Sequence, residues 1–145
     1  MKSFVEYRVP LADLDGMRTV YHPNFIKYFD MARTKLFREA GLPMERWEKS
    51  GVLLPVVACS CDYKAPALFD DHLRITAEIA GIRGKVITVK QTIETLAAGN
   101  LTSGDHASGN VIATGQVILV SCDQDKTPIL LEERFPELYR TLLSD

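Results

Sequence analysis

The chain has 145 residues, of which 46% are hydrophobic and 25% charged, the composition of an ordinary globular protein. Its net charge of −2 gives no general electrostatic reason to expect nucleic acid or an anionic membrane as a partner, and no apolar run approaches the ~20 residues that span a bilayer. Because the first residues lack the apolar core of a secretory signal, we expect a cytoplasmic protein with a single domain, residues 1–145.

The N-terminal part of the chain predicts a strand followed by a long helix. Polar and apolar residues alternate over residues 3–9, which is typical of a strand, and residues 11–22 form a loop. Apolar residues then recur at three- and four-residue steps, which predicts an amphipathic helix over residues 23–40. Pro23 suits its first turn and Gly41 suits the position just past its end. The predicted apolar stripe contains Phe25, Ile26, Phe29, Ala32, Leu36, Phe37 and Ala40.

The rest of the chain is dominated by strand patterns. They cover residues 52–63, 72–82, 86–96 and 110–123. The apolar run at 52–63 predicts a strand buried on both faces, and Pro55 favours an edge position or an early bulge. The tight turn at 83–85 predicts an antiparallel hairpin between the next two strands. Residues 97–109 are rich in Gly, Ser, Asn and Asp, so we expect a long exposed loop.

Two shorter helical segments and three cysteines complete the pattern. Residues 43–50 predict a short helix that Trp47 anchors to the domain, and residues 130–145 predict a terminal helix interrupted near Pro136. The cysteines cannot all pair within one chain, and Cys59 and Cys61 lie on the same face of a strand, so we expect free thiols. The order of elements predicts an α+β domain whose largely antiparallel sheet covers the stripe of the long helix.

The segments 13–15 (DLD) and 20–25 (VYHPNF) resemble the signature of the 4-hydroxybenzoyl-CoA thioesterase family. The acidic residues, the His and the Asn stand at that family's spacing without insertion. Residues 54–75 are similar to the family's second strand and the turn after it, so the resemblance covers nearly the whole chain. It implies the hotdog fold, in which a curved, mostly antiparallel five-stranded sheet wraps a single long central helix.

The resemblance implies hydrolysis of an acyl- or aroyl-CoA thioester, without a cofactor and without a metal. Asp15 matches the catalytic aspartate, which acts as nucleophile or as general base for water, whereas we expect Asp13 to be structural and to hydrogen-bond the loop. Amides near His22 match the donors to the thioester oxygen. Elementary chemistry agrees, because the first turn of a helix offers unpaired N–H groups and the positive end of the helix dipole, and a thioester carbonyl needs a nucleophile and a place for its oxyanion.

Each of the other candidate residues also has an ordinary structural explanation. His22 either takes part in catalysis or caps the helix. Tyr21 is a candidate pocket wall, and Asn24 is a substrate contact or a hydrogen-bonding residue of the first turn. Arg83 and Lys85 flank a hairpin, where solvated charges are routine, or they contact the phosphates of CoA as basic residues do in some members of the family.

The chain departs from the family pattern at Arg18, where the family usually has Gly three residues after the catalytic aspartate. A residue with a Cβ adopts left-handed geometry at a cost of ~1–2 kcal/mol, so Gly16 is an alternative carrier of the turn. Arg18 could also lie beside Asp15 and favour its ionised form.

Two other functions compete with hydrolysis of acyl-CoA. One is a non-catalytic hotdog module that binds acyl thioesters or a protein partner, and the other is a thioesterase acting on acyl-carrier protein. By the same resemblance we expect a homodimer or homotetramer with active sites at the interface, which the open edge of the sheet supports.

Overall fold

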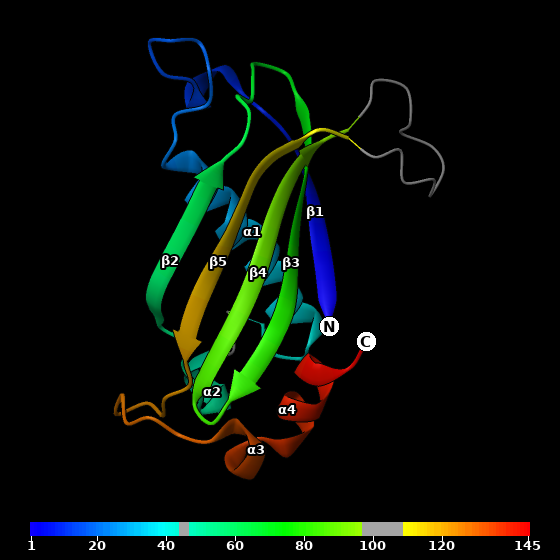
Figure 1. Ribbon diagram of the computed structural model, residues 1–145. Helices are drawn as coiled ribbons and strands as arrows, with labels where there is room; N and C mark the ends of the chain where they lie inside the picture. The colour runs from blue at the N-terminus through cyan, green and yellow to red at the C-terminus, as the bar shows by residue number, and fades with distance from the viewer. Residues whose placement is uncertain (44–46, 97–108) are drawn as a thin grey trace.

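The computed structural model describes residues 1–43, 47–96 and 109–145. It contains one five-stranded sheet that curves around one long helix (Figure 1). The strands are β1 (Lys2–Arg8), β2 (Val56–Tyr63), β3 (His72–Arg83), β4 (Val86–Thr95) and β5 (Val111–Val120). The helices are α1 (Asn24–Glu39), α2 (Trp47–Ser50), α3 (Leu131–Arg134) and α4 (Pro136–Leu143), and a short 3-10 turn spans Leu11–Asp13.

All strand pairs are antiparallel, and the spatial order β1-β3-β4-β5-β2 leaves β1 and β2 as the two edges of an open sheet. The predicted strands begin and end within a few residues of the observed ones. The interruption near Pro136 is also confirmed, because Phe135 separates α3 from α4. The α+β hotdog architecture predicted from the sequence is therefore confirmed.

Helix α1 forms the core by packing the predicted stripe against the concave face of the sheet. Its buried side chains are Phe25, Tyr28, Phe29, Ala32, Leu36 and Phe37, and Ile26 of the predicted stripe is partly buried. The helix lies mainly against β1 and β3 and less against β4. It approaches the sheet closely at Gly115 of β5, where a Cβ atom would lie 2.4 Å from Cε2 of Phe29. The β2 half of the sheet receives less of this cover.

Strand β2 combines a correct and an incorrect prediction. It is an edge strand that begins directly after Pro55, and its register with β5 shifts between Val56 and Ala58, so both consequences expected of the proline are confirmed. The predicted burial on both faces is wrong for the single chain, since Val56 is 46% and Val57 59% exposed. The cause is the position of α1 over the opposite half of the sheet.

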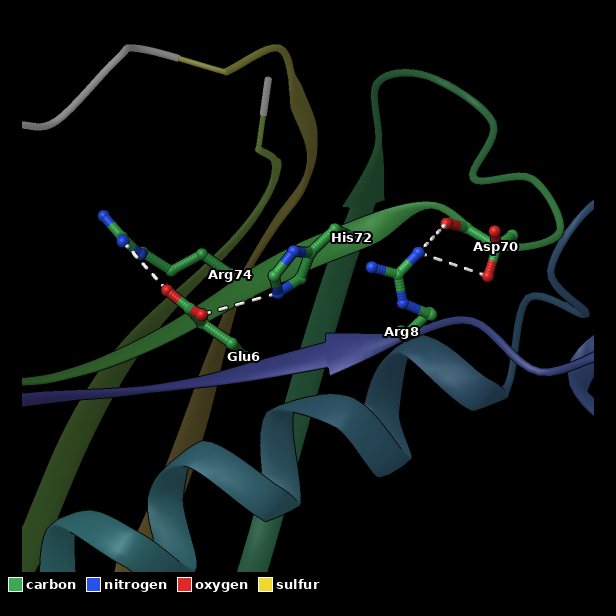
Figure 2. A network of polar contacts seen from close by, with 5 residues as sticks. All are labelled: Glu6, Arg8, Asp70, His72 and Arg74. Atoms are coloured by element: carbon green, nitrogen blue, oxygen red, sulfur yellow. Dashed lines mark hydrogen bonds and ion pairs between the residues drawn. The ribbon is translucent and has the colours of Figure 1, made fainter. Parts of the chain in front are cut away.

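Strand β1, at the other edge, carries charged side chains that pair with residues of β3 and of the turn before it (Figure 2). Glu6 accepts a hydrogen bond from Arg74 of β3 at 3.0 Å and lies 3.4 Å from Nε2 of His72. Arg8 pairs with Asp70 at 3.2 Å, just before β3 begins. Charges of this kind protect an edge strand from pairing with another chain.

Several predictions fall partly outside the described residues. Of the short helix expected at 43–50, the structure describes α2, while residues 44–46 and the side chain of Trp47 lie outside the described part, as do residues 97–108 of the expected loop. The three cysteines are free, as predicted. None of the described helices is long and apolar enough to cross a membrane.

Candidate functional site

The loop ahead of α1 holds Asp15 in a tight hairpin turn. The Asp15 amide donates to the Thr19 carbonyl at 2.9 Å, and the Arg18 amide donates to the Asp15 carbonyl at 3.1 Å. The Met17 amide donates to Oδ1 of Asp15 at 2.8 Å. One carboxylate oxygen of Asp15 is thus engaged by the turn itself, which fixes the orientation of the side chain.

Arg18 occupies the position of this turn that glycine normally takes. Its φ of 65° lies in the left-handed region, whereas Gly16 is not among the residues with positive φ. The alternative in which Gly16 carries the turn is therefore wrong, and Arg18 adopts left-handed geometry despite its Cβ. In a three-residue hairpin loop the last residue is left-handed because it closes a bulge. The described contacts include no ion pair between Arg18 and Asp15.

Residues 123–127, between β5 and α3, form a second copy of the same turn. The amide of Asp123 donates to the Thr127 carbonyl at 2.9 Å, and the amide of Lys126 donates to the Asp123 carbonyl at 3.0 Å. Lys126 is also left-handed, with a φ of 62°. Both turns share the pattern of an aspartate followed three and four residues later by a basic residue and a threonine.

The two aspartates differ in how fully the turn occupies their carboxylates. Oδ1 of Asp123 accepts hydrogen bonds from two backbone amides, those of Asp125 and Thr127, each at 2.9 Å. In the described structure Oδ1 of Asp15 accepts only the amide of Met17. Within the described residues the turn therefore supplies two donors to Oδ1 of Asp123 but only one to Oδ1 of Asp15, which keeps more of its acceptor capacity.

Asp15 lines an open hollow of about 340 Å³ between the loop, the start of α1 and the end of β2. The lining residues are Asp15, Thr19, Val20, His22, Phe25, Tyr63, Lys64, Ala65 and Pro66. A larger hollow of about 530 Å³ lies at the opposite end of α1, between Gly41 and α4, and holds none of the predicted site residues. The smaller hollow is the better candidate site because it joins the two predicted catalytic residues.

Among the described residues, the backbone amide without an acceptor at the start of α1 is that of His22. The amides of Asn24, Phe25 and Ile26 donate to the carbonyls three residues earlier, at 2.9, 3.2 and 3.1 Å. Pro23 has no N–H. Within the described part of the chain the His22 amide donates to no acceptor. Of the unpaired donors predicted at the start of the helix, the described residues therefore leave one N–H group, and it belongs to a residue that lines the hollow.

Tyr63 at the end of β2 holds the His22 peptide from the other side. Its hydroxyl donates to the His22 carbonyl at 3.2 Å. Its ring lies edge-on to the rings of His22 and Phe25, with centroids 6.0 and 5.4 Å apart. Burial and the nearby Cys61 raise the pKa of Tyr63, so the hydroxyl remains a donor at neutral pH. Sequence reasoning missed Tyr63 because strand order alone brings β2 beside the start of α1.

Asp13 lies buried beneath this loop. Its Oδ2 accepts hydrogen bonds from the hydroxyls of Tyr7 on β1, at 3.0 Å, and Tyr28 on α1, at 2.7 Å. Its backbone carbonyl accepts from the Tyr21 amide at 2.9 Å and from Nδ2 of Asn24 at 3.0 Å. Burial, followed by the hydrogen bond to Asp13, raises the pKa of both tyrosines. Both hydroxyls therefore stay protonated at neutral pH and donate to one carboxylate oxygen.

The structure gathers only part of the predicted site within one chain. Tyr21 is half exposed and packs edge-on against His22, outside the residues that line the hollow. Asn24 directs its amide to Asp13 rather than to the hollow. Arg83 and Lys85 are exposed at the β3–β4 turn, at the end of the sheet far from the loop of Asp15 (Figure 1). Lys64 is the basic residue that does line the hollow.

The match to known proteins covers most of the chain. Residues 9–139 match the model of the Thioesterase-like superfamily, and the chain belongs to this family. The acyl-CoA thioester hydrolase YbgC of Escherichia coli O6:H1 is 31% identical over 86 residues, which are 59% of this chain and 64% of the relative. The 4-hydroxybenzoyl-CoA thioesterase of a Pseudomonas species is 28% identical over 98 residues, 66% of this chain and 70% of the relative.

A solved structure confirms the fold. The DHNA-CoA thioesterase from Staphylococcus aureus superimposes with a TM-score of 0.80 at 22% sequence identity, covering 97% of this chain and 87% of that one. The family predicted from the DLD and VYHPNF segments is thus confirmed. The aligned part of the Escherichia coli relative is less than two thirds of that protein's length.

Proposed function

We propose that the chain hydrolyses an acyl- or aroyl-CoA thioester to the free acid and CoA. The observation that carries this proposal is the shared hollow, which is lined both by Asp15, whose carboxylate keeps acceptor capacity, and by His22, whose amide has no acceptor among the described residues. The names of two relatives, an acyl-CoA thioester hydrolase and a 4-hydroxybenzoyl-CoA thioesterase, support the same substrate class.

The proposed chemistry divides between these two groups. Asp15 either attacks the carbonyl carbon, which gives an anhydride that water then hydrolyses, or takes a proton from a water molecule that attacks in its place. In both cases the carbonyl oxygen becomes an oxyanion, which the His22 amide stabilises by a hydrogen bond. Collapse of the intermediate breaks the C–S bond, and CoA leaves as its thiolate.

The positions of the basic residues favour a site completed by a second chain. Lys64 lines the hollow and supplies a cation for an anionic substrate. Arg83 and Lys85 lie at the far end of the sheet, so a role in binding CoA phosphates requires that they serve the site of a neighbouring copy. We therefore propose a homodimer or a larger homo-oligomer.

The edges of the sheet favour β2 as the surface where two copies meet. β1 carries the Glu6 and Arg8 ion pairs beside one exposed apolar residue, Phe4, whereas β2 exposes two adjacent valines, Val56 and Val57, at an edge of the sheet. An exposed apolar edge strand is a ready template for pairing with another chain.

The sharpest test compares Asp15→Asn with Asp123→Asn. Asparagine retains an oxygen that accepts the turn amide, so both variants keep the same turn but lose a negative charge. We expect Asp15→Asn to lower kcat for an acyl-CoA by on the order of 100-fold or more, and Asp123→Asn to leave it unchanged. Release of free CoA, followed with a thiol reagent over short, long and aromatic acyl-CoAs, measures both.

Full turnover by Asp15→Asn contradicts the assignment of the nucleophile or base. A wild-type protein that binds acyl-CoAs without hydrolysing any of them contradicts the enzyme and supports a binding module. The same acyl group presented on CoA and on acyl-carrier protein separates the two carriers. If the chain hydrolyses the CoA thioester faster, and if removing the charges of Arg83 and Lys85 abolishes this preference, the result supports CoA as the carrier.

A further inference from the structure

Asp13 is a buried carboxylate for which the proposed chemistry has no direct use. It is 7% exposed, and the described ion pairs give it no cationic partner. The hydroxyls of Tyr7 and Tyr28 instead converge on one of its oxygens, at 3.0 and 2.7 Å. An unpaired carboxylate in an apolar interior is costly, and charge-assisted hydrogen bonds are the means of retaining it.

The same residue also fixes both ends of the loop that carries the site. Its carbonyl accepts the Tyr21 amide at 2.9 Å and Nδ2 of Asn24 at 3.0 Å. Asp15 follows Asp13 by two residues, and His22 follows Tyr21 by one. A single residue therefore ties β1, α1 and the loop together at the point from which the carboxylate of Asp15 and the amide of His22 are both placed.

We propose that Asp13 is a positioning residue that sets the separation between the Asp15 carboxylate and the His22 amide. This inference rests on the proposed hydrolysis of a thioester. Stability alone does not require the charge, because apolar residues that replace buried charges often keep or increase stability. Catalysis does require fixed geometry, since a displacement of ~1 Å can lower a rate by on the order of 100-fold.

The first test removes one donor at a time. Tyr28→Phe keeps the buried ring but deletes the shorter hydrogen bond to Asp13, and we expect kcat to fall by on the order of 10-fold to 100-fold while KM changes less than about twofold. Asp13→Asn retains an acceptor oxygen for both tyrosines, so it should keep more activity than Asp13→Ala. Ser121→Ala is the matched control for kcat, because it deletes a buried hydrogen bond to the Ile129 carbonyl, 2.7 Å long, and a longer one to the Lys85 carbonyl, 3.3 Å long, both outside the loop of Asp15.

The second measurement is independent of activity. Hydrogen exchange of the Tyr21 amide, which donates to Asp13, and of the Met17 amide, which donates to Asp15, reports the loop directly by NMR. We expect both amides to exchange on the order of 10-fold faster in Tyr28→Phe than in the wild type, with no change in Ser121→Ala.

Lower kcat together with faster exchange in Tyr28→Phe supports the positioning role. Faster exchange with unchanged kcat overturns it, because Asp13 then has only a structural role. An equal loss of kcat in Ser121→Ala also overturns it, since general destabilisation then explains the effect. If Asp15→Asn retains full turnover, the proposed hydrolysis through Asp15 fails, and only the exchange rates then test the role of Asp13. Unchanged exchange in Tyr28→Phe overturns that role. Faster exchange in Tyr28→Phe supports the link between Asp13 and the loop.

Discussion

Asp15 and Asp123 show that an aspartate in the same type of turn can accept different numbers of backbone amides. Both aspartates close a turn with a left-handed basic residue, and both accept a backbone amide two residues later. Asp123 is fully explained by its turn, since the Thr127 amide is a second donor to the same oxygen. Asp15 lacks that second donor and lines a hollow. The local role of an aspartate before a helix is therefore compatible with a catalytic one.

Arg18 and Lys126 permit a matched prediction about backbone strain. Left-handed geometry costs a residue with a Cβ ~1–2 kcal/mol of strain in the folded state, and a change to glycine removes this strain. Glycine also makes the unfolded chain more flexible, which cancels ~0.5–1 kcal/mol of the stabilisation. We expect Arg18→Gly and Lys126→Gly each to raise the free energy of unfolding by about 0.5–1 kcal/mol. Because the turn keeps its shape, kcat for an acyl-CoA should stay within about twofold of the wild type.

Urea denaturation measures the stability of both variants, and thiol release measures the activity of Arg18→Gly. Equal stabilisation of the two turns, with activity retained only by Lys126→Gly, would show that the Arg18 guanidinium itself serves the reaction. Loss of stability in both variants would contradict the strain argument.

At the scale of single residues, the sequence predicted Asp15 and His22, which share the hollow, but not the tyrosines that hold the loop in place. The spacing of Asp15 and His22 lies within one local segment, so the motif was sufficient. Tyr7 and Tyr63 reach the loop from distant parts of the chain, and only the packing of β1 and β2 beside α1 brings them there. Arg83 and Lys85 were predicted as basic residues that bind CoA phosphates, but their place beside a turn contains no information about their distance from Asp15.

At the scale of elements, the period of the apolar residues was enough to place the strands and α1. The helix begins after Pro23 and ends before Gly41, whose φ is 90°, as the end signals predicted. One available signal was overlooked: Gly115 lies inside a predicted strand, where glycine often marks close approach of another element. The structure supplies the reason, because Phe29 of α1 fills the space that a side chain would need.

Gly115→Ala should therefore destabilise the fold. The new Cβ would lie 2.4 Å from Cε2 of Phe29 and 2.5 Å from the backbone oxygen of Ser60, and a backbone atom cannot move aside cheaply. We expect a loss of about 1–3 kcal/mol in the free energy of unfolding, as for other overpacked cores. Gly81→Ala in β3 is the control, since its Cβ would meet nothing within 4 Å.

Urea denaturation of the two glycine variants gives both values. Adding Phe29→Leu to Gly115→Ala should recover part of the loss, because the smaller side chain vacates the contact. Equal stability of Gly115→Ala and the wild type would show that α1 does not approach β5 as closely as the structure indicates.

At the scale of the whole molecule, the error over β2 is informative. Residues 52–63 have the composition of a strand buried on both faces, yet Val56 and Val57 are exposed in the single chain. Residues that become buried are apolar whether their own chain or another copy covers them. The structure of one chain shows only the surfaces that this chain buries itself. The apolar sequence of β2 and its exposure in the single chain are consistent if a second copy of the chain covers β2.

A charge on β2 should therefore separate the subunits of the proposed oligomer. Val57→Lys places a solvated cation on the apolar edge, where Lys is a natural protection against pairing. We expect the wild type to sediment as a dimer or larger species at micromolar concentration and Val57→Lys as a monomer, with kcat/KM lowered on the order of 10-fold or more because the site loses residues of the second chain. Leu143→Lys is the control, because Leu143 is 44% exposed on α4. A monomeric wild type, or a Val57→Lys variant that assembles like the control, would show that β2 is a free edge and that Asp15 works within one chain.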